Sequence, residues 1–434
     1  MISRTRLSAE PDRDWLYCHA HESDLSLSFD GRPIDRLRLA ISEAEYDAKY
    51  HGGVLLPNVK PGKYKLGTGS VVDAIEVVKP PKRATAKVAA GDSAERLQKA
   101  INEGKRDITL APGEHVLTRS VVLPDDSIIR GYGATVRAAA AITPTGDKRP
   151  AFLLGNNCTL YGCTFTHDDP NDHLLYGRDP KNEFPRGLVV ADCTFRRCGM
   201  GFWFKDALIR DCRFERAGAT IAASGLWLRC EFVGQAPMHA WAFGFGLGPV
   251  AMIDCVFDGT DRGPVFNSGA GPISDFLCVG LACRDIDQTP NGNEILLCEG
   301  AHEFSRATIL HTRITGCQSM VQMDSPSSGV LMRDLLIDGG GGFCLWGKVH
   351  NWLVQDFELR NGAGIYLGPD SSDCRFLDGS IVNWQPGRVN QIWQNPSPIG
   401  FKRTIAAWSE GQGNRLERVQ LMNATMRGFE VMGA

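Results

Sequence analysis

The residues best suited to chemistry are four carboxylates that follow short apolar segments in the C-terminal half of the chain: Glu299, Asp324, Asp370 and Glu410. Three aromatic residues and a lysine accompany them in the sequence, namely Trp346, Lys348, Tyr366 and Trp408. Carboxylates roughly 5–5.5 Å apart suit retaining hydrolysis of a glycosidic bond, and those roughly 6.5–9.5 Å apart suit inverting hydrolysis. Aromatic faces beside carboxylates suit sugar rings, which need apolar stacking together with hydrogen bonds. We therefore interpret the carboxylates as catalytic candidates and the other four residues as substrate-binding candidates, against the alternative of a solvated, charged outer wall.

A second polar cluster is the segment 167–173, which reads His-Asp-Asp-Pro-Asn-Asp-His. Its oxygens could hold Ca²⁺, and a histidine could act as a general base. The spacing matches no known calcium-loop template, however, and Asp, Pro and Asn are the residues that turns prefer. We therefore favour a turn-forming loop and expect neither a metal site nor a cofactor.

An internal repeat must position these residues. One six-residue pattern recurs along the chain, as in Leu160-x-x-Cys163-x-Phe165. It consists of an apolar residue, two spacers, an anchor residue, one spacer and a second apolar residue. The anchors are residues 163, 193, 212, 230, 255, 281, 312, 335, 357, 379 and 419, so their spacing is most often in the low twenties. The Leu/Asn consensus of leucine-rich repeats is absent. Coils of this length can pair with their neighbours as parallel strands ~4.8 Å apart, so that equivalent residues stack.

Most coils also show a further short apolar segment after a Gly-rich turn: 201–204, 295–298, 320–323, 342–346, 364–367 and 405–408. The four carboxylates lie just beyond such segments. Stacking would place carboxylates of neighbouring coils ~5 Å apart and those of alternate coils ~9–10 Å apart. These separations bracket both kinds of glycoside hydrolysis.

The start of the repeat region is also recognisable. Asp92 and Ser93 can cap a short amphipathic helix over 94–101, and strand-like segments with a Pro-Gly turn at 112–113 follow it. This order resembles the N-terminal cap of the pectin-lyase-like superfamily, whose fold is shared by pectate lyases, polygalacturonases and phage tailspikes. The resemblance covers Gly91 to about Met432. It implies an all-β chain, a right-handed single-stranded parallel β-helix (a solenoid) with an N-terminal cap helix.

No catalytic residue can be assigned in this sequence from the motifs of the enzymes in this superfamily. The Trp-Ile-Asp-His stretch of pectate lyases is absent, and so is the Asp-Pro-His-Glu motif of alginate epimerases. Of the ordered polygalacturonase motifs only the pair Asp168-Asp169 occurs, in a different context. Tailspikes share no universal motif, so these absences count less against a likeness to tailspikes.

The rest of the chain suggests three segments. Residues 1–76 lack the repeat and are expected to form a small N-terminal attachment or oligomerisation domain, although a simple extension packed on the first coils is an equal alternative. Residues 77–90 are rich in Pro and Lys and are expected to be a linker, and 91–434 form the β-helix. The 14 cysteines are expected to be buried free thiols, because they show no zinc or disulfide spacing and most lie within apolar strand patterns.

Net charge and hydrophobicity limit the classes of function that we consider for this chain. A formal net charge of -3 gives no basic surplus for nucleic acid, and no apolar stretch is long enough to span a membrane. The N-terminus also lacks the apolar run of a secretory signal. We favour a virion surface protein (a phage tailspike, fibre or capsid-attached spike) that binds host polysaccharide, with its degradation left open. Its partners would be a polysaccharide, other virion proteins and further copies in a homo-oligomer such as a trimer. A free polysaccharide lyase or glycoside hydrolase is the alternative, and a scaffold without ligand ranks third.

Overall fold

The computed structural model describes residues 3–5, 15–20, 25–33, 52–57, 61–68, 71–77, 82–140, 142, 150–169, 173–177, 185–201, 204–217, 220–222, 224–234, 242–245, 250–260, 263–268, 271–286, 294–316, 320–339, 342–361, 364–382, 407–424 and 426–432. The chain divides into two compact units. The first comprises Met1–Glu231 with Ala236–Met238, and the second comprises Phe232–Gln235 with His239–Ala434. The boundary falls within strand β26 (Glu231–Val233).

The N-terminal part of the first unit forms two small antiparallel sheets. One has the order β1 (Ser3–Thr5), β2 (Trp15–Ala20), β5 (Gly52–Pro57). The other has the order β4 (Arg32–Pro33), β3 (Leu25–Phe29), β6 (Gly62–Thr68), β7 (Val71–Val77). Neither sheet includes a strand of the repeat region.

Helix α1 (Ala94–Asn102) packs at the start of the repeats, against β8 (Thr85–Val88) and β12 (Val121–Leu123). Its buried face is Ala94, Leu97, Ala100 and Ile101, so the helix is amphipathic. Ser93 does not cap the helix with its side chain; its hydroxyl instead forms a buried 2.8 Å hydrogen bond with the His115 ring. Strand β8 pairs with β10 and therefore belongs to the first coil, although the sequence places it in the linker 77–90.

The first unit continues as parallel strands in three ladders. The first ladder is β8, β10 (Asp107–Leu110), β13 (Ile128–Arg130), β16 (Thr159–Tyr161), β19 (Val189–Ala191), β22 (Ala207–Arg210) and β25 (Gly225–Leu228). The second is β9 (Gly91–Asp92), β11 (Gly113–Leu117), β14 (Ala134–Ala138), β17 (Thr164–His167), β20 (Thr194–Arg196) and β23 (Arg213–Glu215). The third is β12, β15 (Phe152–Leu154), β18 (His173–Gly177), β21 (Gly199–Gly201) and β24 (Thr220–Ala222).

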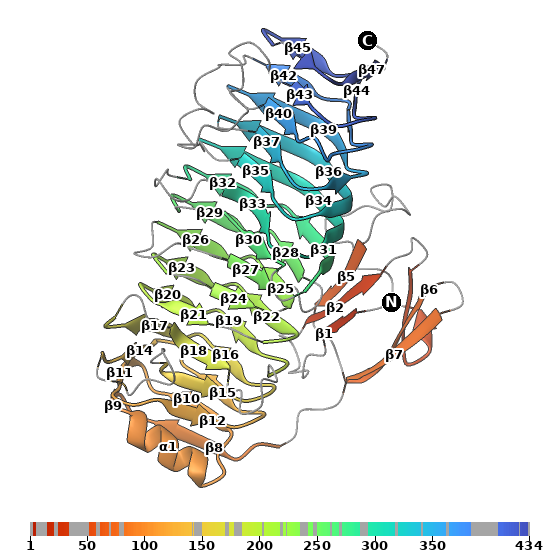
Figure 1. The fold of residues 1–434 in the computed structure, drawn as a ribbon. Helices are drawn as coiled ribbons and strands as arrows, with labels where there is room; N and C mark the ends of the chain where they lie inside the picture. Colours follow the sequence, from red (N-terminus) through yellow and green to blue (C-terminus); the bar gives the residue numbers. More distant parts are fainter. Residues whose placement is uncertain are drawn as a thin grey trace. The chain divides into compact units, whose positions relative to one another are not determined.

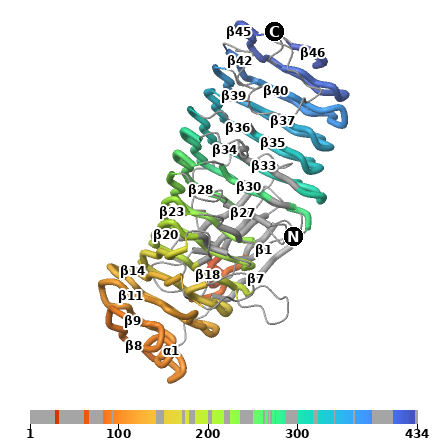
Figure 2. The backbone as a smooth tube through the Cα atoms, turned by 60° about the vertical axis from the view of Figure 1, so that its left-hand side comes forward, coloured from red at the N-terminus to blue at the C-terminus, as the bar shows by residue number. Residues whose placement is uncertain are grey.

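The second unit repeats this plan, as Figures 1 and 2 show for its successive coils. Its first ladder is β28 (Val250–Ile253), β31 (Ile273–Val279), β34 (Phe304–Thr315), β36 (Ser327–Asp338), β39 (Leu353–Arg360), β41 (Arg375–Leu377), β44 (Arg415–Glu417) and β47 (Glu430–Met432), with β38 (Val349–His350) beside β36. Its second ladder is β29 (Val256–Asp258), β32 (Ala282–Arg284), the later halves of β34, β36 and β39, then β42 (Ser380–Val382) and β45 (Gln420–Met422). Its third ladder is β27 (Ala242–Phe245), β30 (Val265–Asn267), β33 (Glu294–Glu299), β35 (Met320–Met323), β37 (Gly342–Leu345), β40 (Gly364–Leu367), β43 (Ala407–Ser409) and β46 (Met426–Arg427). The chain is thus a right-handed parallel β-helix, which confirms the predicted fold class.

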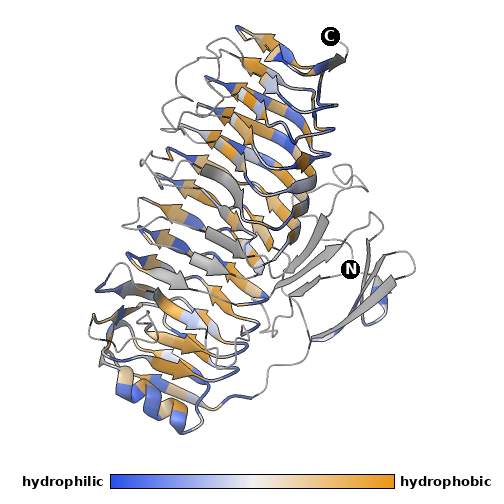
Figure 3. Cartoon of the chain, in the orientation of Figure 1, coloured by the Kyte–Doolittle hydropathy of each residue, from blue (hydrophilic) through white to orange (hydrophobic). Residues whose placement is uncertain are grey.

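The predicted anchor and apolar positions form the interior. Phe165, Phe195 and Phe214 stack with centroid separations of 5.0 and 5.1 Å. The cysteine anchors are buried free thiols, with no more than 2% exposure at Cys163, Cys193, Cys212, Cys230 and Cys255. Burial raises the pKa of another interior thiol, Cys198, to about 12, so it stays protonated. The strands accordingly carry most of the apolar residues and the turns most of the polar ones (Figure 3).

Each anchor follows a residue in the left-handed backbone conformation, which turns the chain from the first ladder to the second. The φ angles at these corners include 55° at Asp192, 53° at Asp211 and 54° at Asp334. Glycine and Asp adopt this conformation at less cost than most residues. The sequence therefore places Asp or Gly at most of these corners, and the corner residues stack in a column of their own.

Candidate functional site

The third ladder of the second unit positions the residues that the sequence singles out. In β37 and β40, Phe343 and Ile365 pair in register and are fully buried in the interior. Because neighbouring residues of a strand face opposite sides, the next residues, Cys344 and Tyr366, face outward. Trp408 of β43 pairs with Tyr366 and continues this outer row.

Three aromatic residues form what we call the aromatic column: Trp346, Tyr366 and Trp408. The ring centroids of Trp346 and Tyr366 are 5.1 Å apart with a 60° interplanar angle, and those of Tyr366 and Trp408 are 6.0 Å apart at 79°. The Arg427 guanidinium lies 5.8 Å from the centre of the Trp408 ring. Trp346 and Trp408 are half-buried, so each offers part of its ring to solvent.

Tyr366 occupies the middle of the aromatic column and is only 1% exposed. Burial raises the pKa of its phenol, and the negative charge of Glu410 raises it further. The phenol therefore stays protonated beside the Glu410 carboxylate. Tyr366 fills the gap between the two tryptophans. It offers little surface to a ligand itself, in contrast to the direct contact that the sequence suggests.

The other candidates lie in the turns that follow the third-ladder strands. Glu299 is the last residue of β33, and Asp324 follows β35; the residues before them, Cys298 and Met323, pair in register. Lys348 is exposed in the turn after β37, Asp370 is exposed after β40, and Glu410 is exposed after β43. The candidates thus come from successive coils, each about 4.8 Å from the next. The turn from β43 to the bridge at Gln412 is shorter than the corresponding turn from β40 to Ser372, so the charged residues do not form one column.

The described half of the segment 167–173 has a structural role. His167 is buried, and its Nδ1 accepts a 2.9 Å hydrogen bond from the backbone N–H of Asp169. Asp168 forms a bidentate ion pair with Arg137 at 2.9 and 3.1 Å. Residues 170–172 lie outside the described part of the chain. Among described residues no group of three or more His, Cys, Asp or Glu is arranged to hold a metal ion.

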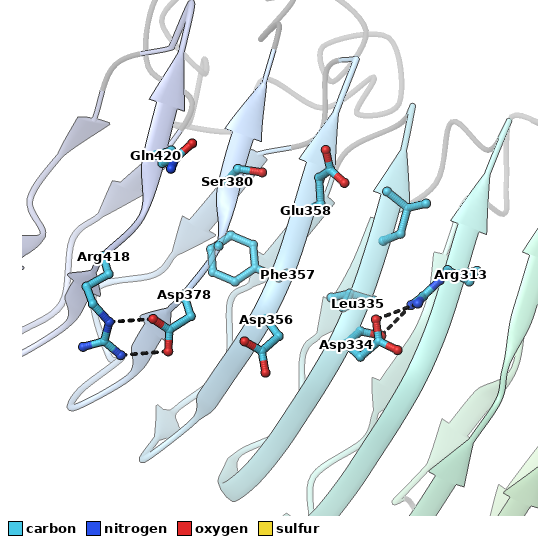
Figure 4. A pocket seen from close by; sticks show the side chains of 12 residues that line it. Arg313, Asp334, Leu335, Asp356, Phe357, Glu358, Asp378, Ser380, Arg418 and Gln420 are labelled. Carbon is cyan, nitrogen blue, oxygen red and sulfur yellow. Dashed lines mark hydrogen bonds and ion pairs between the residues drawn. The ribbon is translucent and has the colours of Figure 1, made fainter. Parts of the chain in front are cut away.

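A hollow that the sequence analysis did not identify lies on the corner between the first and second ladders of the second unit (Figure 4). Its volume is about 620 Å³, and Asp334, Asp356 and Asp378 line it from consecutive corners. The sequence does contain a signal for this site, because an Asp stands immediately before the anchors 335, 357 and 379. Only the structure shows that side chains of the second ladder complete a concave wall opposite these residues.

Comparison with solved structures supports the fold, whereas the comparisons of sequence found no match. No protein-family model matches the chain, and no curated protein matches its sequence. Tailspike protein 3 of bacteriophage CBA120 aligns with a TM-score of 0.52 and 14% identity over 86% of this chain and 64% of that one. The chain therefore spans somewhat less than two thirds of that tailspike.

Two other solved structures align less closely. The family 28 exopolygalacturonase of Yersinia enterocolitica has 12% identity over 98% of this chain and 99% of its own, with a TM-score of 0.39. The gp42 tailspike of Acinetobacter phage vb_AbaP_AS12 has 11% identity over 80% of this chain and 59% of its own, with a TM-score of 0.38. The likeness to the CBA120 tailspike supports the right-handed parallel β-helix fold of this chain. Within the described residues, no helix is both long and apolar enough to cross a bilayer.

Proposed function

We propose that this protein is a virion surface protein of the tailspike kind, and that the aromatic column binds a host cell-surface polysaccharide. The single observation that carries the proposal is the row of Trp346, Tyr366 and Trp408 on the outer side of adjacent coils, with charged groups beside it. Residues 1–76 would attach the protein to other virion proteins. The proposal includes a homo-oligomer, with a trimer as the first state to consider.

The chemistry of the aromatic column fits a sugar polymer. Half-buried indole rings stack on the apolar faces of sugar rings. Glu410 accepts hydrogen bonds from hydroxyl groups, and Arg427 and Lys348 donate them. Three successive coils extend about 10 Å along the solenoid. A polysaccharide lying along the axis would therefore contact several coils at once, and each coil would add affinity without a deep pocket.

The test is retention of surface polysaccharides by purified protein, measured by biolayer interferometry over a panel from candidate bacterial hosts. We expect Trp408→Ala and Trp346→Ala each to weaken binding of the retained polysaccharide about tenfold, a loss of about 1.4 kcal/mol, because each removes an indole face on which a sugar ring stacks. The matched control is Tyr132→Ala, which removes an aromatic residue that is 48% exposed in the first unit. Unchanged binding by both tryptophan variants, or no binding to the panel by the native protein, would refute the proposal.

A polysaccharide lyase or glycoside hydrolase is the second candidate. It is favoured by the position of Asp324 and Asp370 on alternate coils and of Glu299 and Asp324 on adjacent ones. These backbone positions fit the two carboxylate separations of glycoside hydrolysis. The same panel separates the candidates, because an enzyme releases reducing ends or unsaturated products and a binding protein leaves the polymer intact.

A further inference from the structure

The corner groove of the second unit has two walls (Figure 4). One wall is the column of corner residues Asp334, Asp356, Asp378 and Arg418. The other is the outward row of the second ladder, Arg313, Leu336, Glu358, Ser380 and Gln420, whose members pair in register from coil to coil. Between the two walls lie Leu335, Phe357 and Gly379. The groove runs across coils, in the direction in which equivalent residues stack.

The groove is hollow where the coil of Gly379 and Ser380 carries short side chains. At Gly379 an added Cβ would come within 2.3 Å of the Phe357 ring, so only glycine allows that ring to lie where it does. Phe357 is 3% exposed and forms part of the floor, and Ser380 beside Gly379 projects little into the space above it. The result is the cavity of about 620 Å³.

Three of the four carboxylates that line the groove are paired with arginines. Glu358, in the middle coil, accepts two hydrogen bonds of 2.6 Å from Arg360. Asp334 accepts hydrogen bonds from Arg313 at 2.6 Å and His311 at 2.7 Å. Asp378 accepts hydrogen bonds from Nε and one terminal nitrogen of Arg418, at 2.5 and 2.7 Å. Asp356, in the coil between them, is exposed and has no hydrogen-bond or ion-pair partner among the described residues.

Two further polar groups of the groove are equally open. Within the described part of the chain, the hydroxyl of Ser380 and the carboxamide of Gln420 have no side-chain hydrogen bond. Left-handed backbone geometry accounts for an Asp at 356 by itself, with φ of 53°. It does not account for a hydroxyl and a carboxamide on the opposite wall, nor for the hollow between them.

We propose that the corner groove is a second carbohydrate site and that it takes an uncharged oligosaccharide. Asp356 would accept hydrogen bonds from sugar hydroxyls, and Ser380 and Gln420 can both donate and accept. Asp334, Glu358 and Asp378 are paired with arginines and Asp356 is not, so the groove keeps a negative charge that disfavours a uronate or sulfated sugar. The coils of Asp356, Ser380 and Gln420 extend about 10 Å, the length of a short oligosaccharide. This site uses a different ladder from the aromatic column, so the two sites can fail separately.

The test uses the full chain on a glycan array that carries uncharged, amino-sugar and uronate oligosaccharides together, followed by calorimetric titration of the best uncharged ligand. Asp356→Asn keeps a residue that tolerates the left-handed conformation and removes the charge. Ser380→Ala removes one hydroxyl. The matched control is Asp373→Asn, another exposed corner carboxylate, with φ of 56°, outside the groove.

The site requires that Asp356→Asn weaken the uncharged ligand about tenfold or more, because a hydrogen bond to a charged group is lost. Ser380→Ala should weaken it by a smaller factor, and Asp373→Asn should leave it unchanged. Failure of the native protein to bind any uncharged oligosaccharide overturns the site, and so does full affinity in Asp356→Asn. If Trp408→Ala abolished binding of that ligand and Asp356→Asn did not, the corner site would also be overturned, and the aromatic column would remain supported. Tighter binding of a uronate would overturn the ligand class.

Discussion

One residue in each coil, the residue just before the anchor, determines how the chain turns from the first ladder to the second. It needs the left-handed conformation, and an Asp is a low-cost way to provide it. Stacking then brings corner charges about 4.8 Å apart, and arginines on neighbouring coils neutralise them. Asp211 is held by Arg229 at 2.7 and 2.9 Å, and Asp378 by Arg418. The ion pairs of this corner thus follow from a backbone requirement. Among the described residues, neither Asp254 nor Asp356 has an arginine partner, and of these two only Asp356 lines the corner groove.

A pH-dependent contribution to stability belongs to the pair Arg375–Glu417. The Arg375 guanidinium donates to both Glu417 oxygens at 2.8 and 2.9 Å, and this hydrogen bonding holds the pKa of Glu417 below its ordinary value. A depressed folded-state pKa stabilises the fold above the unfolded value of about 4.3, and that stability is lost as the pH falls through the lower folded-state value.

We therefore expect Glu417→Gln to lower the free energy of unfolding by about 1 kcal/mol at neutral pH. The difference from the native protein should shrink as the pH falls below about 4.3. Urea titrations at several pH values, followed by tryptophan fluorescence, measure it. The control is Glu103→Gln, an exposed residue at the end of α1 that has no side-chain partner among those described. A difference that stays constant from neutral to acid pH would contradict this account.

At the scale of the strand, stacking coils need glycine where backbones meet. Gly342 of β37 pairs with Gly364 of β40, and its φ is 71°. A Cβ at Gly342 would lie 2.0 Å from the Gly364 carbonyl oxygen, which is backbone and cannot rotate away. Gly259 has a similar φ of 60° but meets nothing within 4 Å.

These two glycines separate backbone strain from steric conflict. Gly259→Ala should destabilise the protein by roughly 1–2 kcal/mol, which is the cost of the left-handed conformation alone. Gly342→Ala should cost about 3 kcal/mol or more, because overpacking adds to the same strain. Denaturant midpoints of the two variants give the comparison. Equal effects would mean that β37 and β40 can separate to admit a methyl group, and that the ladder is less rigid than described.

Much of this element-level order is predictable from the sequence, because each coil repeats the same alternation. The anchors form the interior column, and the segments 320–323 and 364–367 are the strands β35 and β40. The corner groove is not predictable in the same way. It depends on which residue of one coil lies over which residue of the next. Because the coils differ in length, this register cannot be read from the spacing in the sequence. The burial of Tyr366 escapes prediction for a related reason, since Trp346 and Trp408 flank it from neighbouring coils.

At the scale of the whole molecule, both units share one plan and differ in what their outer walls display. In the first unit the described corner charges are largely paired, as with Asp211 and Arg229. The second unit carries the aromatic column on its third ladder and the corner groove between its first and second ladders. A solenoid keeps its walls rigid because each coil is bonded to its neighbours. Sparse groups on such a wall therefore hold fixed spacings, which suits recognition of a polymer that itself repeats.

The most direct test of the central claim is a crystal structure of the protein with oligosaccharides derived from a polysaccharide that it retains. The account predicts sugar rings in contact with Trp408 and Trp346, with hydroxyl groups bonded to Glu410. Sugar found elsewhere, with both tryptophans and Glu410 in contact only with water, would contradict it.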